Sequence, residues 1–292
     1  MSNLVQGLTT RGGNAAAIQH HYDVSNEFYS LWLDSSLTYS CGFWDNPAMD
    51  DNLEQSQQKK IDWHLETSGA TTGKRLLDIG CGWGALMRRY VNGYPDRQAV
   101  GLTLSHNQYE QICSLGLDNI KVYEESWIVH QPMTTYDAIV SIGAFEHFAK
   151  PETTSEEKIS VYREFFGQCQ QWLKPKGKLS LQTITYGSLS AEEKNWFTQN
   201  EIFPDSELPR PGEILIAADR LFEIKTYRND RLQYGKTCDL WLNNLRRQKS
   251  LIIEGFGEKI YRKYEQYLKL VVAGFYFGQI LLLRLEMQSL AK

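Results

Sequence analysis

The sequence predicts an α/β protein built on a doubly wound, mostly parallel sheet. Two observations predict this class. From residue 74 onward, short apolar runs alternate with amphipathic segments at the spacing of βαβ units. A glycine-rich turn directly follows the first of these runs. The 292 residues suffice for a large core, and the apolar fraction of 42% is ordinary for a globular protein. We therefore expect a single domain over residues 1–292.

The expected elements follow from local patterns of apolar residues and turn signals. Strands are expected at 74–80, 98–104, 118–126, 136–143, 178–185, 222–230 and 279–287. Helices are expected at 15–34, 53–68, 84–94, 105–116, 161–173, from about 236, and at 258–276. The helix at 161–173 places Val161, Phe165, Cys169 and Trp172 on one face, and KPKG (174–177) ends it. The stretch 186–222 breaks the alternation and is expected to cross one end of the sheet.

Composition excludes several classes of partner. A net charge of −4 gives no basic field for nucleic acid. The five cysteines (Cys41, Cys81, Cys113, Cys169, Cys238) are scattered without a C-x-x-C pair, which indicates neither a disulfide framework nor a metal site and fits a reducing cytoplasm. The N-terminus lacks a signal-peptide core. The most apolar stretch, 270–283, is too short to span a bilayer, so no stable membrane insertion is expected.

The glycine turn has the spacing Asp78-x-Gly80-x-Gly82-x-Gly84 between a strand and a helix. Such a turn lets the backbone approach a nucleotide-sized ligand closely. A dinucleotide site requires its third glycine three residues after the second, and an acidic residue at the end of the next strand. That strand ends in Leu102, Thr103 and Leu104. The spacing therefore favours an S-adenosylmethionine loop over a nicotinamide site or a purely structural turn.

Six motifs occur in the order that characterises one enzyme family. They are HYDVSNEFY…LTYSCGFW, LLDIGCGWG, VGLTLSHNQY, SIGAFEHF, FPDSELP and YGKTCDLW. Together they resemble the cyclopropane fatty acid synthase family, which includes the mycolic acid cyclopropane synthases, from about residue 18 to the C-terminus. The resemblance implies a class I (Rossmann-like) methyltransferase fold with an antiparallel C-terminal strand. It divides the chain into a helical lid (15–70), a cofactor-binding core (74–185), an excursion covering the substrate site (186–222) and a C-terminal part (223–292).

The resemblance also implies which residues bind S-adenosylmethionine. Tyr39 and Ser40 match the pair at the methionine end, Asp78, Gly80, Gly82 and Gly84 the glycine loop, Thr103 and Leu104 the ribose contacts, Gln108 a polar contact beyond them, and Ser126 and Trp127 the adenine pocket. An aromatic slot suits adenine, and an aromatic face stabilises a sulfonium cation. The aromatic residues near the N-terminus, with His20 and Tyr22, are then either a lid over the cofactor or ordinary core packing.

The reaction centre departs from the family at one position. The family methylates a carbon–carbon double bond and uses a bicarbonate ion to remove the resulting proton. Matching positions for its bicarbonate cage are Cys41, Glu146, Tyr234 and the backbone of Ile142, whereas the histidine falls at Gln182. An amide donates a hydrogen bond but relays no proton. Either Gln182 and main-chain donors still hold bicarbonate, or Glu146 accepts the proton directly or steers an amine or cation.

These features predict a methyltransferase that acts on carbon of an apolar, alkene-bearing or lipid-like substrate, by C-methylation or cyclopropanation. The alternative is an N- or C-methyltransferase of a specialised-metabolite small molecule, with Glu146 acting without bicarbonate. A non-catalytic cofactor-binding protein is a third interpretation. The residues Cys41 and Glu146 also have plain structural interpretations, as a small buried side chain and as a carboxylate at the start of a helix. The sequence predicts no metal site and leaves the oligomeric state open.

Overall fold

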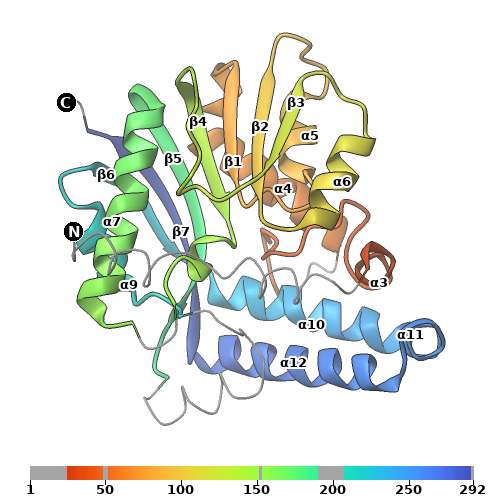
Figure 1. The fold of residues 1–292 in the computed structure, drawn as a ribbon. Coiled ribbons are helices and arrows are strands. Elements are labelled where there is room, and N and C mark those ends of the chain that lie inside the picture. Colours follow the sequence, from red (N-terminus) through yellow and green to blue (C-terminus); the bar gives the residue numbers. More distant parts are fainter. Residues whose placement is uncertain (1–24, 49–51, 151–152, 190–206, 291–292) are drawn as a thin grey trace, which may run out of the picture.

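The computed structural model describes residues 25–48, 52–150, 153–189 and 207–290 (Figure 1). Its strands form one seven-stranded sheet in the order β3-β2-β1-β4-β5-β7-β6. The strands are β1 (Arg75–Ile79), β2 (Gln98–Thr103), β3 (Ile120–Glu124), β4 (Tyr136–Ile142), β5 (Leu173–Tyr186), β6 (Phe222–Asn229) and β7 (Ile280–Ser289). Strands β1 to β5 pair in parallel, and β7 is antiparallel to both of its neighbours. The predicted α/β class with an antiparallel C-terminal strand is confirmed.

Helices cover both faces of the sheet and one of its ends (Figure 1). They are α3 (Asn26–Ser30), α4 (Leu53–Thr67), α5 (Ala85–Val91), α6 (His106–Ser114), α7 (Ser155–Trp172), α9 (Pro211–Ala218), α10 (Arg231–Arg247), α11 (Lys249–Phe256) and α12 (Glu258–Phe277), with the short 3-10 turns η1 (Ala70–Thr72) and η2 (Phe145–His147). Helices α10, α11 and α12 run across the lower end of the sheet in Figure 1, with α3 beside them.

The buried apolar side chains form three clusters, because successive residues of a strand point to opposite faces. Leu77 of β1 packs with the helices α7 and α9 on one face. Its neighbour Leu76 packs with α4, α5 and α6 on the other face. The third cluster joins α3, α10 and α12, and it includes Trp83 from the turn after β1. This third cluster therefore lies at the carboxyl ends of the parallel strands, where ligands bind in doubly wound folds.

Two helix boundaries differ from the sequence prediction. The helix expected at 15–34 is present only at Asn26–Ser30, and residues 15–24 lie outside the described residues. The chain turns at Asp34, whose carboxylate accepts the backbone N–H groups of Ser36 and Thr38 in competition with a helix. Helix α7 begins at Ser155, six residues before the expected start at 161. Thr154 and Glu157 form a capping box there, a T-x-x-E signal that the sequence contains.

Three further segments differ from the prediction. Helix α10 begins at Arg231 and not near 236. It therefore contains Gly235, where a Cβ would lie 3.2 Å from the Tyr276 ring, so glycine allows α12 to approach. Strand β5 begins at Leu173 and runs through KPKG, with Lys176 in the left-handed region at φ 61°. Helix α11 had no counterpart in the predicted elements. Within the expected excursion at 186–222, residues 190–206 lie outside the described residues, and α9 follows them.

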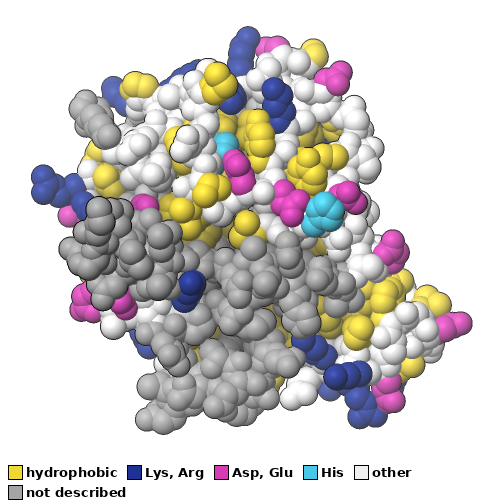
Figure 2. Space-filling model, viewed as in Figure 1, with side chains coloured by type: hydrophobic (Ala, Val, Ile, Leu, Met, Phe, Trp, Pro, Cys, Tyr) yellow, Lys and Arg dark blue, Asp and Glu magenta, His cyan; other side chains and the backbone are white. Residues whose placement is uncertain are grey.

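Among the described residues, the features that would indicate a binding partner are charged surface, membrane-crossing helices, metal ligands and disulfides. Acidic and basic side chains are interspersed with hydrophobic ones on the face drawn in Figure 2. None of the helices in the described part of the chain has the length and apolar character that a membrane crossing requires. No group of three or more potential metal ligands was found among the described residues. All five cysteines are free.

Candidate functional site

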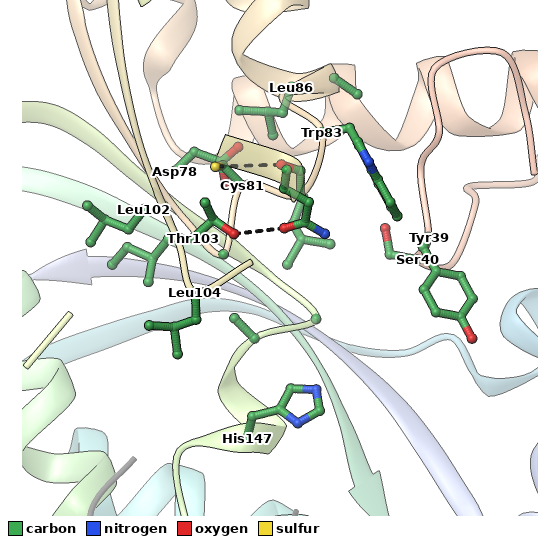
Figure 3. Close-up of a pocket in the computed structure, with 18 of the residues that line it drawn as sticks. Tyr39, Ser40, Asp78, Cys81, Trp83, Leu86, Leu102, Thr103, Leu104 and His147 are labelled. Carbon is green, nitrogen blue, oxygen red and sulfur yellow. Dashed lines mark hydrogen bonds between the residues drawn. The ribbon is translucent and has the colours of Figure 1, made fainter. Parts of the chain in front are cut away.

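A cavity of about 360 Å³ opens at the carboxyl ends of β1, β2 and β4 (Figure 3). Most of its wall comes from five segments: 37–40 between α3 and α4, 78–83 in and after β1, 102–104 in and after β2, 125–128 after β3, and 142–148 at the end of β4 and after it. Residues of α4, α5 and α6 complete it. Its volume lies in the range of ~300–1,000 Å³ that is usual for small-molecule sites. The cavity is thus of a size and in a place that suit a nucleotide-sized cofactor.

The glycine loop forms the floor of this cavity. Gly80, Gly82 and Gly84 have φ angles of 79°, 54° and 77°, a region that residues with a Cβ rarely adopt. A Cβ on Gly80 would lie 2.5 Å from the Cβ of Ala144, whereas a Cβ on Gly82 would meet no atom within 4 Å. Gly82 therefore presents bare backbone to open space, which is what close approach by S-adenosylmethionine requires. Gly84 does not line the cavity and instead caps α5.

Polar groups at the ends of β1 and β2 face the same cavity. Asp78 is buried, and burial raises the pKa of its carboxyl to about 7, although the positive charge of Lys60 opposes the shift. The hydroxyl of Thr103 donates to the amide oxygen of Gln108 at 2.8 Å (Figure 3). This bond uses the oxygen of the Gln108 amide, and among the described residues no acceptor binds its NH₂ group. Thr103 and Gln108 thus place polar groups in the cavity wall, and their contact with a ribose stays a prediction.

The remaining predicted cofactor residues also line the cavity. Leu104, Ser126 and Trp127 belong to its wall, and the Trp127 ring lies 5.4 Å from that of Phe148. Tyr39 and Ser40 close the other side (Figure 3). Ten of the eleven residues assigned to the cofactor from the sequence therefore meet around one space, and Gly84 is the exception.

The segment predicted as a lid contains an aromatic core. Phe28, Tyr29 and Trp32 are fully buried in the cluster shared with α10 and α12. The Tyr29 ring also lies 5.5 Å from Tyr39 and 5.3 Å from Trp83, two residues of the cavity wall. The described part of this segment is therefore packed core that also supports the cavity. His20 and Tyr22 lie outside the described residues, and closure over a cofactor remains a prediction.

Several residues of the cavity wall were not assigned to the site from the sequence, among them Trp83, His147 and Lys60. Trp83 stands inside the glycine motif, and its indole N–H donates to Asn26 at 2.7 Å. His147 follows Glu146 directly, and burial lowers its pKa to about 4. Lys60 is buried, and its ammonium donates to the Ser40 hydroxyl at 2.8 Å. The first two adjoin predicted motifs, but Lys60 follows Lys59 in a polar helix and resembles a surface residue in the sequence.

The predicted reaction centre lies beside the cofactor cavity. Ile142 lines the cavity, while Cys41, Glu146 and Tyr234 are buried beyond its wall. The Thr183 hydroxyl donates to Glu146 at 3.0 Å, and burial raises the pKa of the Glu146 carboxyl to about 7. Burial raises the pKa of Tyr234, and negative charge on its neighbours, which include Cys41 and Glu146 after Cys238 and Tyr267, adds to the rise. The fold thus brings these three side chains into one electrostatic neighbourhood.

Gln182 is held by an arginine that the sequence analysis did not single out for this role. Gln182 pairs with Ile142 on β4 and with Arg284 on β7. The fully buried Arg284 donates from Nε to the amide oxygen of Gln182 at 2.8 Å. It also donates to Asp230 at 2.5 Å and to the Gly42 carbonyl at 2.8 Å, and its Nη2 lies 3.3 Å from the sulfur of Cys41. Burial raises the pKa of the Cys41 thiol to about 11, and the charge of Arg284 opposes this rise.

Comparison with known proteins identifies the family. Residues 10–285 match the family described as mycolic acid cyclopropane synthetase. Cyclopropane mycolic acid synthase 1 of Mycobacterium tuberculosis is 35% identical over 285 residues, which cover 91% of this chain and 94% of that protein. The crystal structure of mycolic acid cyclopropane synthase CmaA1 complexed with SAH and CTAB superposes with a TM-score of 0.83 at 32% identity, covering 95% of this chain and 99% of the other.

An N-methyltransferase shares the fold at lower identity. Coclaurine N-methyltransferase, bound to N-methylheliamine and SAH, has a TM-score of 0.79 at 21% identity, covering 99% of this chain and 86% of the other. At this identity the likeness concerns architecture alone. The family match, the curated relative and the cavity built on the glycine loop agree. The chain therefore belongs to the mycolic acid cyclopropane synthetase family of S-adenosylmethionine-dependent methyltransferases.

Proposed function

We propose that the enzyme transfers a methyl group from S-adenosylmethionine to a carbon of an alkene-bearing, lipid-like acceptor, giving a methylated or cyclopropane product. One observation carries the proposal: the carboxylate of Glu146 is buried, and one of its oxygens lies 3.9 Å from the place of a Cβ on Gly143, a residue of the cavity wall. The names of the relatives, which are synthases of cyclopropane mycolic acids, support the acceptor class. The bound CTAB in CmaA1 is a long-chain amphiphile and supports it further.

The proposed cofactor contacts use residues around the cavity. S-adenosylmethionine supplies an electrophilic methyl group carried on a positively charged sulfur. The bare backbone at Gly80 and Gly82 allows close approach, and Thr103 and Gln108 offer hydrogen bonds to a ribose. Trp127 offers an aromatic wall to adenine, and Tyr39 offers a π-face to a cation. Asp78, Leu104, Ser126 and Ser40 complete the proposed set.

The proposed base is Glu146. Methylation of a double bond leaves a carbocation on the acceptor, and that cation must lose a proton. A carboxylate whose pKa is about 7 is well matched to accept a proton near neutral pH. Arg284 has only donors, so the oxygen of the Gln182 amide faces it and the NH₂ faces elsewhere. In this proposal Gln182 is held in place by Arg284 and takes no part in proton transfer, and the proton passes to Glu146. Tyr234, stacked on Phe275, and Cys41 shape an apolar surround.

Because Gln182 stands where the family has a histidine, the experiment also tests the alternative acceptor, a small amine. Purified enzyme would be given S-adenosylmethionine with phospholipids or fatty acyl chains that contain one cis double bond. We expect a product heavier by one CH₂ group in mass spectrometry, and its loss in Glu146→Gln. Turnover of small amines, together with no turnover of alkenes, would overturn the lipid acceptor in favour of a specialised-metabolite methyltransferase.

We also propose a reducing cytoplasm as the location, which the five free cysteines support.

A further inference from the structure

Two lysines of the described structure, Lys60 and Lys158, are buried, and their surroundings differ. Lys158 lies 2.9 Å from a carboxylate oxygen of Glu213 and 3.7 Å from one of Glu207. Lys60 is 1% exposed, yet no ion pair joins it to any carboxylate of the described residues. Its one hydrogen bond is to the Ser40 hydroxyl at 2.8 Å. Because a buried charge without an opposite charge is costly, this ammonium calls for an anionic partner.

The free donors of Lys60 belong to the wall of the cofactor cavity. An ammonium has three N–H donors and no acceptor, and Ser40 uses only one of them. Because Lys60 donates to the Ser40 oxygen, the Ser40 hydrogen remains available for a further acceptor. Both residues line the cavity (Ser40 is labelled in Figure 3). The ammonium and the hydroxyl therefore offer adjacent donors to whatever occupies this end of the cavity.

The charged groups around Lys60 do not supply the missing partner. Asp34 and Asp78 favour its protonated form from a distance, as does a thiolate at Cys41, whereas Arg284 disfavours it. The Asp34 carboxylate is already occupied by backbone N–H groups of its own turn. Asp78 is itself buried with a raised pKa, so it carries a full negative charge only above about pH 7. A carboxylate brought by a ligand would fill the gap.

We infer that Lys60 and Ser40 form the subsite for the terminal carboxylate of the bound cofactor. This inference rests on the assignment of S-adenosylmethionine as the cofactor. That molecule has one anionic group, because its adenine and ribose are neutral and its sulfonium and α-ammonium are positive. Only the carboxylate would be attracted by Lys60, and the other charged groups would be repelled. Lys60 is thus a binding residue that fixes which end of the cofactor enters this part of the cavity.

Calorimetry with a pair of ligands tests the subsite. The probes are S-adenosylhomocysteine and its decarboxylated analogue, which differ only in the carboxylate. Wild-type enzyme is expected to bind the first more tightly. Lys60→Met should weaken its binding about 10- to 100-fold, the loss of a charge-assisted hydrogen bond, while the analogue changes less than about twofold. Lys59→Met is the matched control, because Lys59 is the partly exposed neighbour, is paired with Asp45 and does not line the cavity, and it should leave both affinities unchanged.

A second variant and a pH series keep the result decisive. Ser40→Ala should lower affinity for S-adenosylhomocysteine by a smaller factor and spare the analogue. Burial lowers the pKa of Lys60 to about 7, so carboxylate binding should be strongest below pH 7 and weaken above it. Equal losses for both ligands in Lys60→Met would make Lys60 a structural residue and overturn the inference alone. Wild-type enzyme that binds neither ligand would overturn the cofactor assignment together with it.

Discussion

The cofactor cavity and the proposed reaction centre adjoin at Ile142, yet they are built in opposite ways. The cavity is an open space of about 360 Å³ bounded by strand ends and bare glycine backbone. The reaction centre is filled with side chains whose polar atoms bind one another, as Glu146 binds Thr183 and Gln182 binds Arg284. The difference teaches that contiguous motifs form the first region, whereas the second depends on partners far apart in the chain. Arg284 contacts residues 102 and 243 positions away.

The largest expected effect separates chemistry from cofactor binding. Glu146→Gln keeps the shape of the side chain and its contact with Thr183 but removes the base. We expect turnover to fall by ~10²–10⁴-fold, with the affinity for S-adenosylhomocysteine nearly unchanged. In wild type, turnover should rise with pH through about 7 as the carboxyl ionises. Steady-state rates and calorimetry check both points, and a fully active variant would remove Glu146 from the mechanism.

Gly82→Val is the converse variant, because it should impair cofactor binding in the cavity without changing the proposed reaction centre. Gly82→Val places a branched side chain in the open space and in a left-handed backbone, so binding of S-adenosylhomocysteine should weaken by at least about 100-fold. Gly116→Val is a matched control, because Gly116 also has a positive φ with no atom within 4 Å of a Cβ but lies outside the cavity wall. Equal binding by the two variants would contradict the place of the cofactor.

The Glu146 carboxyl should also have a smaller effect, on how the free energy of unfolding depends on pH. Burial raises the pKa of Glu146 from 4.5 to about 7, so the folded protein holds this proton more tightly than the unfolded chain. Its contribution to stability is fully present below pH 4.5 and is lost as pH rises through about 7. Glu146→Gln should therefore gain on the order of 1–3 kcal/mol relative to wild type between pH 5 and 8. Denaturant unfolding at several pH values measures this, and a constant difference would contradict it.

The smallest effect concerns bicarbonate. Since Arg284 holds Gln182 and Glu146 is the proposed proton acceptor, removal of dissolved CO₂ should change turnover less than about twofold. Gln182→His would place an imidazole beside the guanidinium of Arg284, and we expect turnover to fall about 3- to 10-fold. Turnover is measured in degassed buffer, first without bicarbonate and then with increasing added bicarbonate. Stimulation that saturates with bicarbonate would instead assign the base to that ion, held by Gln182 and main-chain donors.

The sequence predicted the cavity better than the reaction centre for physical reasons. Gly80, Gly82 and Thr103 follow strands whose apolar runs are plain, so their positions at one edge of the sheet follow from the fold class. Gln182 was predicted as a departure from the family, but its orientation depends on Arg284, which the sequence places only at the border of an apolar run. Lys60 follows Lys59 in a polar helix, and its burial arises from tertiary packing alone. The length of α7 was predictable in principle from its capping box.

The place of β7 in the sheet has a consequence for biosynthesis. It leaves the ribosome after the six other strands of the described sheet, yet it lies between β5 and β6. Strand β6 pairs with β7 and not with β5, so it cannot join the nascent sheet, which ends at β5, before β7 is made. Arg284 arrives with β7 and binds the carbonyls of Cys41 and Gly42, which were translated far earlier. A ribosome-bound chain can thus fold its glycine loop well before its proposed catalytic pocket is complete. Pauses late in translation would prolong this partly folded state.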